Sequence, residues 1–181
     1  SRQFPDAWQD TGARHRGQNG YSTIIGNEYF TYIVSTESKS RINFLQILHG
    51  GNPRYLINED AADYIETLKP SSWLQGHLLL HARDRAMDQA EWKKFLPELN
   101  LVAEGEIRLI TEAALFASLI EKGIPRDLGV HGDDAGQFNV FVRSLCWVHE
   151  ERHYRKLIPF DEATRLAIEQ VRGEIWDLYR G

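Results

Sequence analysis

The sequence has a single cysteine, Cys146, among its 181 residues, so it cannot form a disulfide within the chain. It also lacks any apolar run of about eighteen residues, the length that a membrane-spanning helix needs. Its opening segment, SRQFPDAWQD, contains no apolar stretch of the kind found in signal peptides. These absences argue against membrane insertion and secretion, and we expect a cytoplasmic protein.

The sequence contains fewer basic than acidic residues. The 21 lysine and arginine residues are outnumbered by 26 acidic residues, which gives a formal net charge of −5. Proteins that bind nucleic acid through their overall charge are basic, so the composition argues mildly against that mode of binding. Basic residues do gather locally, at Arg14, His15 and Arg16 and again at Arg152, His153, Arg155 and Lys156.

Apolar residues make up 42% of the chain, enough for a folded core, and the length suits one domain. Segments rich in β-branched and aromatic residues, broken by glycines, predict strands near 4–9, 20–26 and 29–35. Ser38 is expected to cap a helix that Gly50 and Gly51 end.

The middle of the chain predicts helices. After a short strand at 54–57, helical spacing from about 59 to 123 predicts a helical insertion, with one buried stripe at Ile110, Ala113, Ala117 and Ile120. DLGVH at 127–131 predicts a buried strand, and another apolar segment covers 140–148. Asp161 is expected to cap a last helix over about 161–180, whose apolar face is Ile168, Val171, Ile175 and Leu178.

Three aspartates are candidates for chemistry. Asp133 and Asp134 directly follow the strand predicted at 127–131, where a carboxylate projects into a crevice open to substrate, and Asp10 ends the first predicted strand. Two-metal phosphoryl transfer uses several carboxylates, because Mg²⁺ prefers oxygen ligands and two ions about 4 Å apart stabilise the attacking and leaving oxygens. The pair is also compatible with a helix cap, and Asp10 with a turn aspartate that hydrogen-bonds the backbone.

Cys146 and His149 form a C-x2-H pair that invites a zinc site or an activated thiolate. A structural zinc ion takes four ligands, and the sequence has no second cysteine to supply them. We expect both residues to lie on a strand near the active site, partly buried. Residues three apart on a strand point to opposite faces, which disfavours both alternatives.

Four segments taken together carry a family resemblance: QDTGARHRGQNGYSTIIGNEYFTYIVSTESKSRINFLQIL, INEDAADYI, GDDAGQFNVF and LCWVHEERHYRKL. In this order they resemble one group of bacterial insertion-sequence transposases with a DDE catalytic domain, from about Trp8 to Tyr179. The resemblance implies an RNase H-like fold in which three carboxylates bind Mg²⁺ (or Mn²⁺) for DNA strand cleavage and strand transfer. It also implies that DNA is the partner, as transposon ends and target, and that the protein acts at the nucleoid. It is compatible with a homo-oligomer in the full-length protein, whose oligomeric state the sequence does not give.

The family's catalytic positions are carried over one at a time. The second aspartate falls on Asp133, with Asp134 as its neighbour. The first falls in WQDTGARH, where relatives carry two acids before Thr-Gly and this sequence has Gln9 in place of the first. Asp10 is then the acid expected to share the metal with Asp133. The third carboxylate, a glutamate, is expected beyond the helix that ends at Tyr179, and the family's DNA-binding N-terminal segments are expected outside this chain.

The sequence therefore predicts an α/β fold with an RNase H-like mixed sheet, flanking helices and a helical insertion, as part of a catalytic domain over 1–181. The leading hypothesis is a DDE transposase fragment that is inactive alone and has no membrane contact. A second hypothesis is a non-catalytic remnant that binds DNA or a partner protein, which Gln9 favours. A third is an unrelated metal-dependent nuclease of the same fold, in which Glu169 or Glu174 completes the cluster.

Overall fold

The computed structural model describes residues 6–15, 18–36, 38–68, 71–132 and 136–180 of the chain, and only the backbone of residues 6–11, 13–15, 18 and 19. One five-stranded sheet is combined with helices, which confirms the expected α/β class. The strands lie in the order β3-β2-β1-β4-β5. They are β1 (Asp6–His15), β2 (Gln18–Gly26), β3 (Thr31–Thr36), β4 (Gly129–Gly132) and β5 (Val142–Leu145).

The sheet is mixed. β1, β2 and β3 pair antiparallel as consecutive strands, whereas β4 runs parallel to β1 and β5 runs parallel to β4. A parallel neighbour requires a crossover, because the chain must return to the same end of the sheet before it pairs. Here the described part of the chain between β3 and β4 supplies that crossover with five α-helices. The described helices are α1 (Arg41–Leu48), α2 (Glu59–Leu68), α3 (Ser72–Leu79), α4 (Gln89–Phe95), η1 (Leu96–Leu99), α5 (Glu104–Glu121), η2 (Gly136–Phe138), α6 (Trp147–Arg155) and α7 (Glu162–Arg180).

The turn between β2 and β3 depends on two residues. Asn27 accepts a hydrogen bond from the Tyr29 N–H through its side-chain oxygen (2.9 Å), and its own N–H donates to the carbonyl of Phe30 (3.0 Å). A Cβ at Gly26 would lie 2.8 Å from that carbonyl oxygen, so only glycine fits without a backbone shift. The second and third strands expected from the sequence are thus confirmed, within two residues of their predicted ends.

Helix α1 begins two residues later than expected. Ser40 is its cap, with Oγ accepting from the Asn43 N–H at 3.1 Å. Ser38, the expected cap, instead accepts from the side-chain amide of Asn43 through Oγ (2.9 Å) and its backbone oxygen (2.7 Å). Gly50 and Gly51 end the helix as predicted, with φ angles of +69° and +83° that favour glycine.

The region expected to be helical, from about 59 to 123, contains α2 to α5. Helix α5 is the centre of the core: Ile110, Ala113 and Ala117 are fully buried, and Ile120 is partly buried. Burial extends around most of α5, because α1 and α2 both pack against it. The short strand expected at 54–57 is reduced to an isolated bridge between Tyr55 and Met87, reinforced by stacking of Tyr55 on Trp92 with ring centroids 4.9 Å apart.

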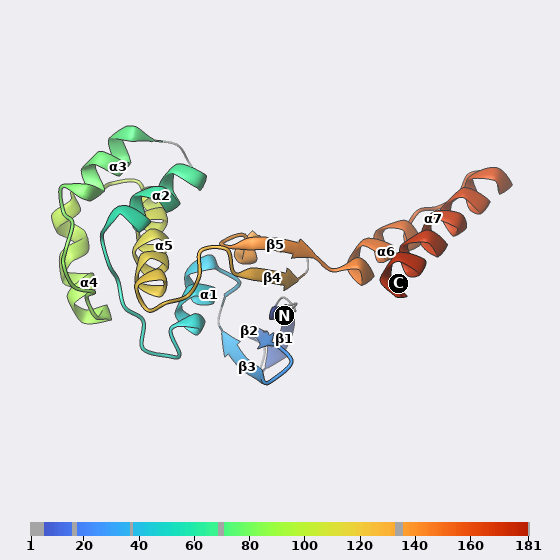
Figure 1. The fold of residues 1–181 in the computed structure, drawn as a ribbon, viewed down its shortest axis with the longest axis horizontal. Coiled ribbons are helices and arrows are strands. Elements are labelled where there is room, and N and C mark those ends of the chain that lie inside the picture. The colour runs from blue at the N-terminus through green and yellow to red at the C-terminus, as the bar shows by residue number, and fades with distance from the viewer. Residues whose placement is uncertain (1–5, 16–17, 37, 69–70, 133–135, 181) are drawn as a thin grey trace.

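The chain leaves the sheet through β5 and continues into α6 and α7, which project away from the helical cluster (Figure 1). Asp161 caps α7 as expected, accepting from the Thr164 N–H at 2.7 Å. Ile175 of the predicted apolar face is buried, but Leu178 is 69% exposed, so the prediction is wrong for the end of this helix. Among the described residues, none of the helices is long and apolar enough to cross a membrane.

Candidate active site

The pairing of β1 with β4 brings together two regions that are far apart in sequence. Their parallel ladder joins Asp6 to Val130 and ends where Trp8 pairs with Gly132. Asp10 lies two residues further along β1, and Asp133 directly follows Gly132 in the sequence. Asp133 and Asp134 lie outside the described residues, and Asp10 is described only through its backbone. The close approach of their carboxylates therefore stays a prediction.

The local prediction for Asp10 needs correction. The first strand was expected to end near residue 9, but β1 continues to His15, and Asp10 pairs with Thr23 in the middle of the antiparallel ladder with β2. The reading of Asp10 as a turn aspartate is wrong for the same reason, since no turn occurs there. The partner strand β2 continues opposite β1 through this region, and its pairing overrides the turn signal of the Thr-Gly pair.

The strand expected through Cys146 and His149 is also wrong, because β5 ends at Leu145 and α6 begins at Trp147. Cys146 is the residue before the helix, and its N–H donates to the carbonyl of Gly132 at 2.9 Å. The N-terminus of α6 therefore lies at the edge where β4 ends. Cys146 and His149 do not lie on one strand, so the argument that they point to opposite faces of a strand fails. The two side chains still supply only two of the four ligands that a structural zinc ion takes. Among the described residues, no three His, Cys, Asp or Glu side chains group closely enough to hold a metal ion.

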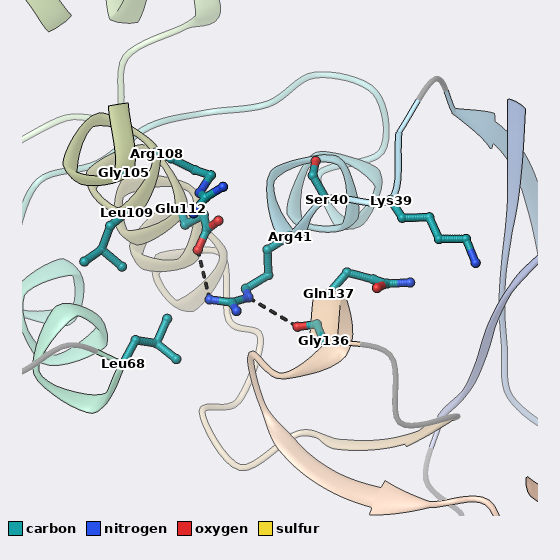
Figure 2. A pocket seen from close by; sticks show the side chains of 10 residues that line it. All are labelled: Lys39, Ser40, Arg41, Leu68, Gly105, Arg108, Leu109, Glu112, Gly136 and Gln137. Carbon is teal, nitrogen blue, oxygen red and sulfur yellow. Dashed lines mark hydrogen bonds and ion pairs between the residues drawn. The ribbon is translucent and has the colours of Figure 1, made fainter. Parts of the chain in front are cut away.

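A pocket of about 550 Å³ lies between α1, α5 and the segment after β4 (Figure 2). Arg41 on α1 crosses it, with Nη1 donating to Oε2 of Glu112 on α5 (3.1 Å) and Nε donating to the carbonyl of Gly136 in η2 (3.4 Å). Arg108 and Lys39 complete the charged lining. One arginine thus joins the crossover helices to the segment that follows Asp133 and Asp134.

Glu112 is a buried acid in this pocket, with only 6% of its side chain exposed. Burial raises the pKa of the Glu112 carboxyl, and the nearby guanidinium groups of Arg41 and Arg108 oppose that rise only in part. The Tyr64 hydroxyl lies 3.4 Å from Oε2, and burial followed by the charge of Glu112 raises the pKa of Tyr64. Tyr64 therefore stays protonated and donates to the carboxylate.

Sequence reasoning missed the Arg41 and Glu112 pair. A signal was present, because Glu112 stands in a largely apolar run of the same helix, between Ile110 and Ala113. An acid that is buried in such a run requires a partner. That partner, however, lies in another helix, and neither composition nor spacing points to it.

Two other groups of predicted residues can be placed. Glu169 and Glu174 are exposed on α7, where Glu169 pairs with Arg165 (2.6 Å) and Glu174 accepts from Gln170 (2.9 Å). Each of the two carboxylates therefore makes a contact with another residue of α7. The second basic cluster lies exposed on and just after α6: Arg152, His153, Arg155 and Lys156. The side chains of the first cluster, at 14–16, are not among those described.

The chain was compared with known proteins. No protein-family model and no solved structure matches it. Among curated proteins it is similar to y4jO, an uncharacterized protein of Sinorhizobium fredii (strain NBRC 101917 / NGR234), with 35% identity over 173 residues. The similarity covers 94% of this chain and 54% of the relative, so the chain spans about half the length of the curated relative it matches. The name of the relative assigns no activity.

Proposed function

We propose that this chain is part of the RNase H-like catalytic core of a DDE transposase, which performs Mg²⁺-dependent DNA strand cleavage and strand transfer. The observation that carries the proposal is the parallel pairing of β1 with β4. It sets the backbone leading to Asp10 beside the backbone leading to Asp133. The sheet order supports the same fold, because β1 lies at the centre, with its antiparallel neighbour β2 on one side and its parallel neighbour β4 on the other.

The donor set fits the metal that this chemistry uses. Asp10, Asp133 and Asp134 would supply hard carboxylate oxygens, which Mg²⁺ prefers and binds at about 2.1 Å. The bound ions would polarise the phosphodiester and lower the pKa of the attacking water or 3′-hydroxyl. No protein nucleophile is needed, and Cys146 has no part in the proposal.

Specific residues favour or disfavour two alternative functions. Gln9 favours a non-catalytic remnant that binds DNA or a partner protein, because an amide offers a metal one oxygen and no charge. The exposed basic cluster of α6 would serve such binding equally well. An unrelated nuclease completed by Glu169 or Glu174 is disfavoured by the contacts that both acids make along α7.

Metal binding tests the proposal directly. We expect this chain to bind Mn²⁺, measured by the loss of the free-ion electron paramagnetic resonance signal on titration. Asp10→Asn and Asp133→Asn should each weaken binding at least about tenfold, because even residues that only support metal ligands are worth about 10–100-fold. Gln9→Asp should strengthen binding if residue 9 belongs to the site.

Asp84→Asn is the matched control, since Asp84 is exposed and no hydrogen bond or ion pair holds it within the described chain. It should bind Mn²⁺ as the parent chain does. Equal affinity in the parent chain, Asp10→Asn and Asp133→Asn would refute the proposed site and leave the non-catalytic remnant as the better function.

A further inference from the structure

The strand β3 forms one edge of the sheet, where it pairs with β2 on one side only (Figure 1). We propose that its open side pairs antiparallel with β3 of a second copy of this chain, about a two-fold axis at Ile33. The sheets of the two copies would then join into one continuous sheet. The inference concerns how copies of the chain assemble, and it does not depend on the proposed transposase chemistry.

The hydrogen bonding of the β2–β3 hairpin indicates which backbone groups of β3 point outward. The Asn27 N–H donates to the carbonyl of Phe30, and these two residues lie opposite each other in the β2–β3 register. Along an antiparallel ladder, hydrogen-bonded pairs alternate with pairs whose N–H and C=O groups point away from each other. Thr31, Ile33 and Ser35 occupy these outward-pointing positions. Among the described residues, no hydrogen bond reaches their backbone groups from outside the strand.

β3 lacks the features by which exposed edge strands commonly avoid pairing with another chain, such as charged side chains, prolines and β-bulges. Its six residues, TYIVST, include no charged residue and no proline. Its pairing with β2 runs without a bulge from Thr31 to Thr36. The other edge strand, β5, is shorter and carries Arg143. β3 is therefore the edge that is better suited to add a strand.

The sequence of β3 is complementary to itself in the proposed register. Antiparallel pairing centred on Ile33 places Ile33 opposite the same residue of the partner, and Thr31 opposite the partner's Ser35. Each of these pairs uses outward-pointing groups and exchanges two backbone hydrogen bonds. Hydroxyl side chains that face each other across two strands add to the stability of the pair. The chain has a net charge of −5, but the uncharged strands meet without repulsion at this edge.

A pocket beside β3 has room for side chains of the added strand. Its volume is about 440 Å³, and its lining includes Tyr32 and Val34 of β3 and Asn43 and Gln46 of α1, with no charged residue. Side chains alternate between the two faces along a strand. The proposed register therefore places Tyr32 opposite the partner's Val34 on the face that lines the pocket.

The exposed side chains of β3 and its turn indicate how strong the contact is. Phe30, Tyr32 and Ile33 are 49%, 50% and 63% exposed. At about 200 Å² for a whole large side chain, they offer roughly 300 Å² per copy. A standard interface buries about 800 Å² per partner, so even with the strand backbones added the contact is at the small end of specific interfaces. We expect a dimer in exchange with the monomer, with a Kd on the order of micromolar.

Analytical ultracentrifugation of this chain over a wide range of concentrations tests the proposal. We expect the mass to rise from 20.9 kDa towards twice that value as the concentration increases. Ile33→Lys should weaken dimerisation by at least about tenfold, because the pairing places two like charges directly opposite each other. The Ile33 side chain is mostly exposed in the single chain, so this variant should keep its fold, which circular dichroism checks.

Ile158→Lys is the matched control, because it makes the same exchange at an isoleucine that is 91% exposed between α6 and α7. It should dimerise as the parent chain does. Weakening by Ile158→Lys alone would overturn the proposal and place the interface at α6 and α7. A chain that stays monomeric at every concentration would also overturn it. Assemblies larger than a dimer would contradict the two-fold pairing, which occupies the β3 edge of both copies.

Cross-linking tests the register. In a hydrogen-bonded antiparallel pair the two opposite Cα atoms lie about 5.5 Å apart, within the range of about 4.4–6.8 Å that a disulfide spans. In a Cys146→Ser background, Ile33→Cys should therefore form a covalent dimer under mild oxidation, seen on a non-reducing gel. Ser35→Cys is the control, because residues 35 of the two copies would be displaced by four positions, or about 13 Å, along the strands. Equal cross-linking of the two variants would refute the register centred on Ile33.

Discussion

His49 is a buried histidine with both ring nitrogens engaged. Nε2 lies 3.1 Å from the carbonyl of Leu115 and Nδ1 lies 3.1 Å from Nζ of Lys122. A neutral ring satisfies both contacts, since Nε2–H donates to the carbonyl and Nδ1 accepts from the ammonium. Burial is the main cause that lowers the pKa of His49 to about 4, with the charge of Lys122 acting in the same direction.

This lowered pKa predicts acid sensitivity. Between pH 6.5 and pH 4 the unfolded chain binds a proton at His49 that the folded chain does not, so stability falls as the pH falls. The loss should reach about 2 kcal/mol by pH 5, measured by urea unfolding at several pH values. His49→Gln should flatten this dependence, whereas His153→Gln, at an exposed position, should not. Parallel pH profiles for the parent chain and His49→Gln would contradict the assignment.

The contacts of buried charged and titratable residues such as His49 and Arg41 could not be predicted from the sequence. No role was assigned from the sequence to His49 or to Arg41. Their functions in the fold depend on partners in another helix, α5, at Leu115 and Glu112. Local pattern identifies a residue that needs a partner but does not supply the partner's identity, because tertiary packing decides it.

At the scale of single elements, helix and strand types were predicted better than their ends. The apolar segment containing Leu145 and Val148 shows why: it joins the end of β5 to the start of α6, and a short apolar run has no periodicity that separates the two. Similarly, the Thr-Gly pair after Asp10 is a turn signal in isolation, but pairing with β2 keeps it extended.

Two glycines give a test of element stability. Gly173 lies inside α7, where an added Cβ meets nothing, so Gly173→Ala should stabilise the protein by about 0.5–1 kcal/mol through lower backbone entropy in the unfolded chain. Gly26→Ala should instead destabilise it, because the new Cβ would meet the Phe30 carbonyl oxygen at 2.8 Å. Thermal unfolding followed by circular dichroism measures both. Equal shifts in the same direction would contradict the difference in local packing between Gly26 and Gly173.

At the scale of the whole molecule, the composition of the proposed metal site predicts how much catalytic activity the chain has. In Mg²⁺ we expect this chain to nick supercoiled plasmid DNA weakly or not at all, because Gln9 would offer the proposed metal site one oxygen and no charge. Agarose gel electrophoresis of the plasmid measures the result. Robust nicking that Asp133→Ala abolishes would contradict this expectation and make Glu169 or Glu174 candidates for a completing ligand.

The topology of the sheet predicts the order in which the parts of the molecule fold. The helices from α2 to α5 pack on one another within residues 59–121, whereas β1 pairs with β4 only after the whole crossover has been made. Closing so long a loop costs entropy before any pairing rewards it. We therefore expect the helical cluster to collapse first and the central pair of the sheet to form late. The edge proposed to hold the metal would then be the last part of the molecule to assemble.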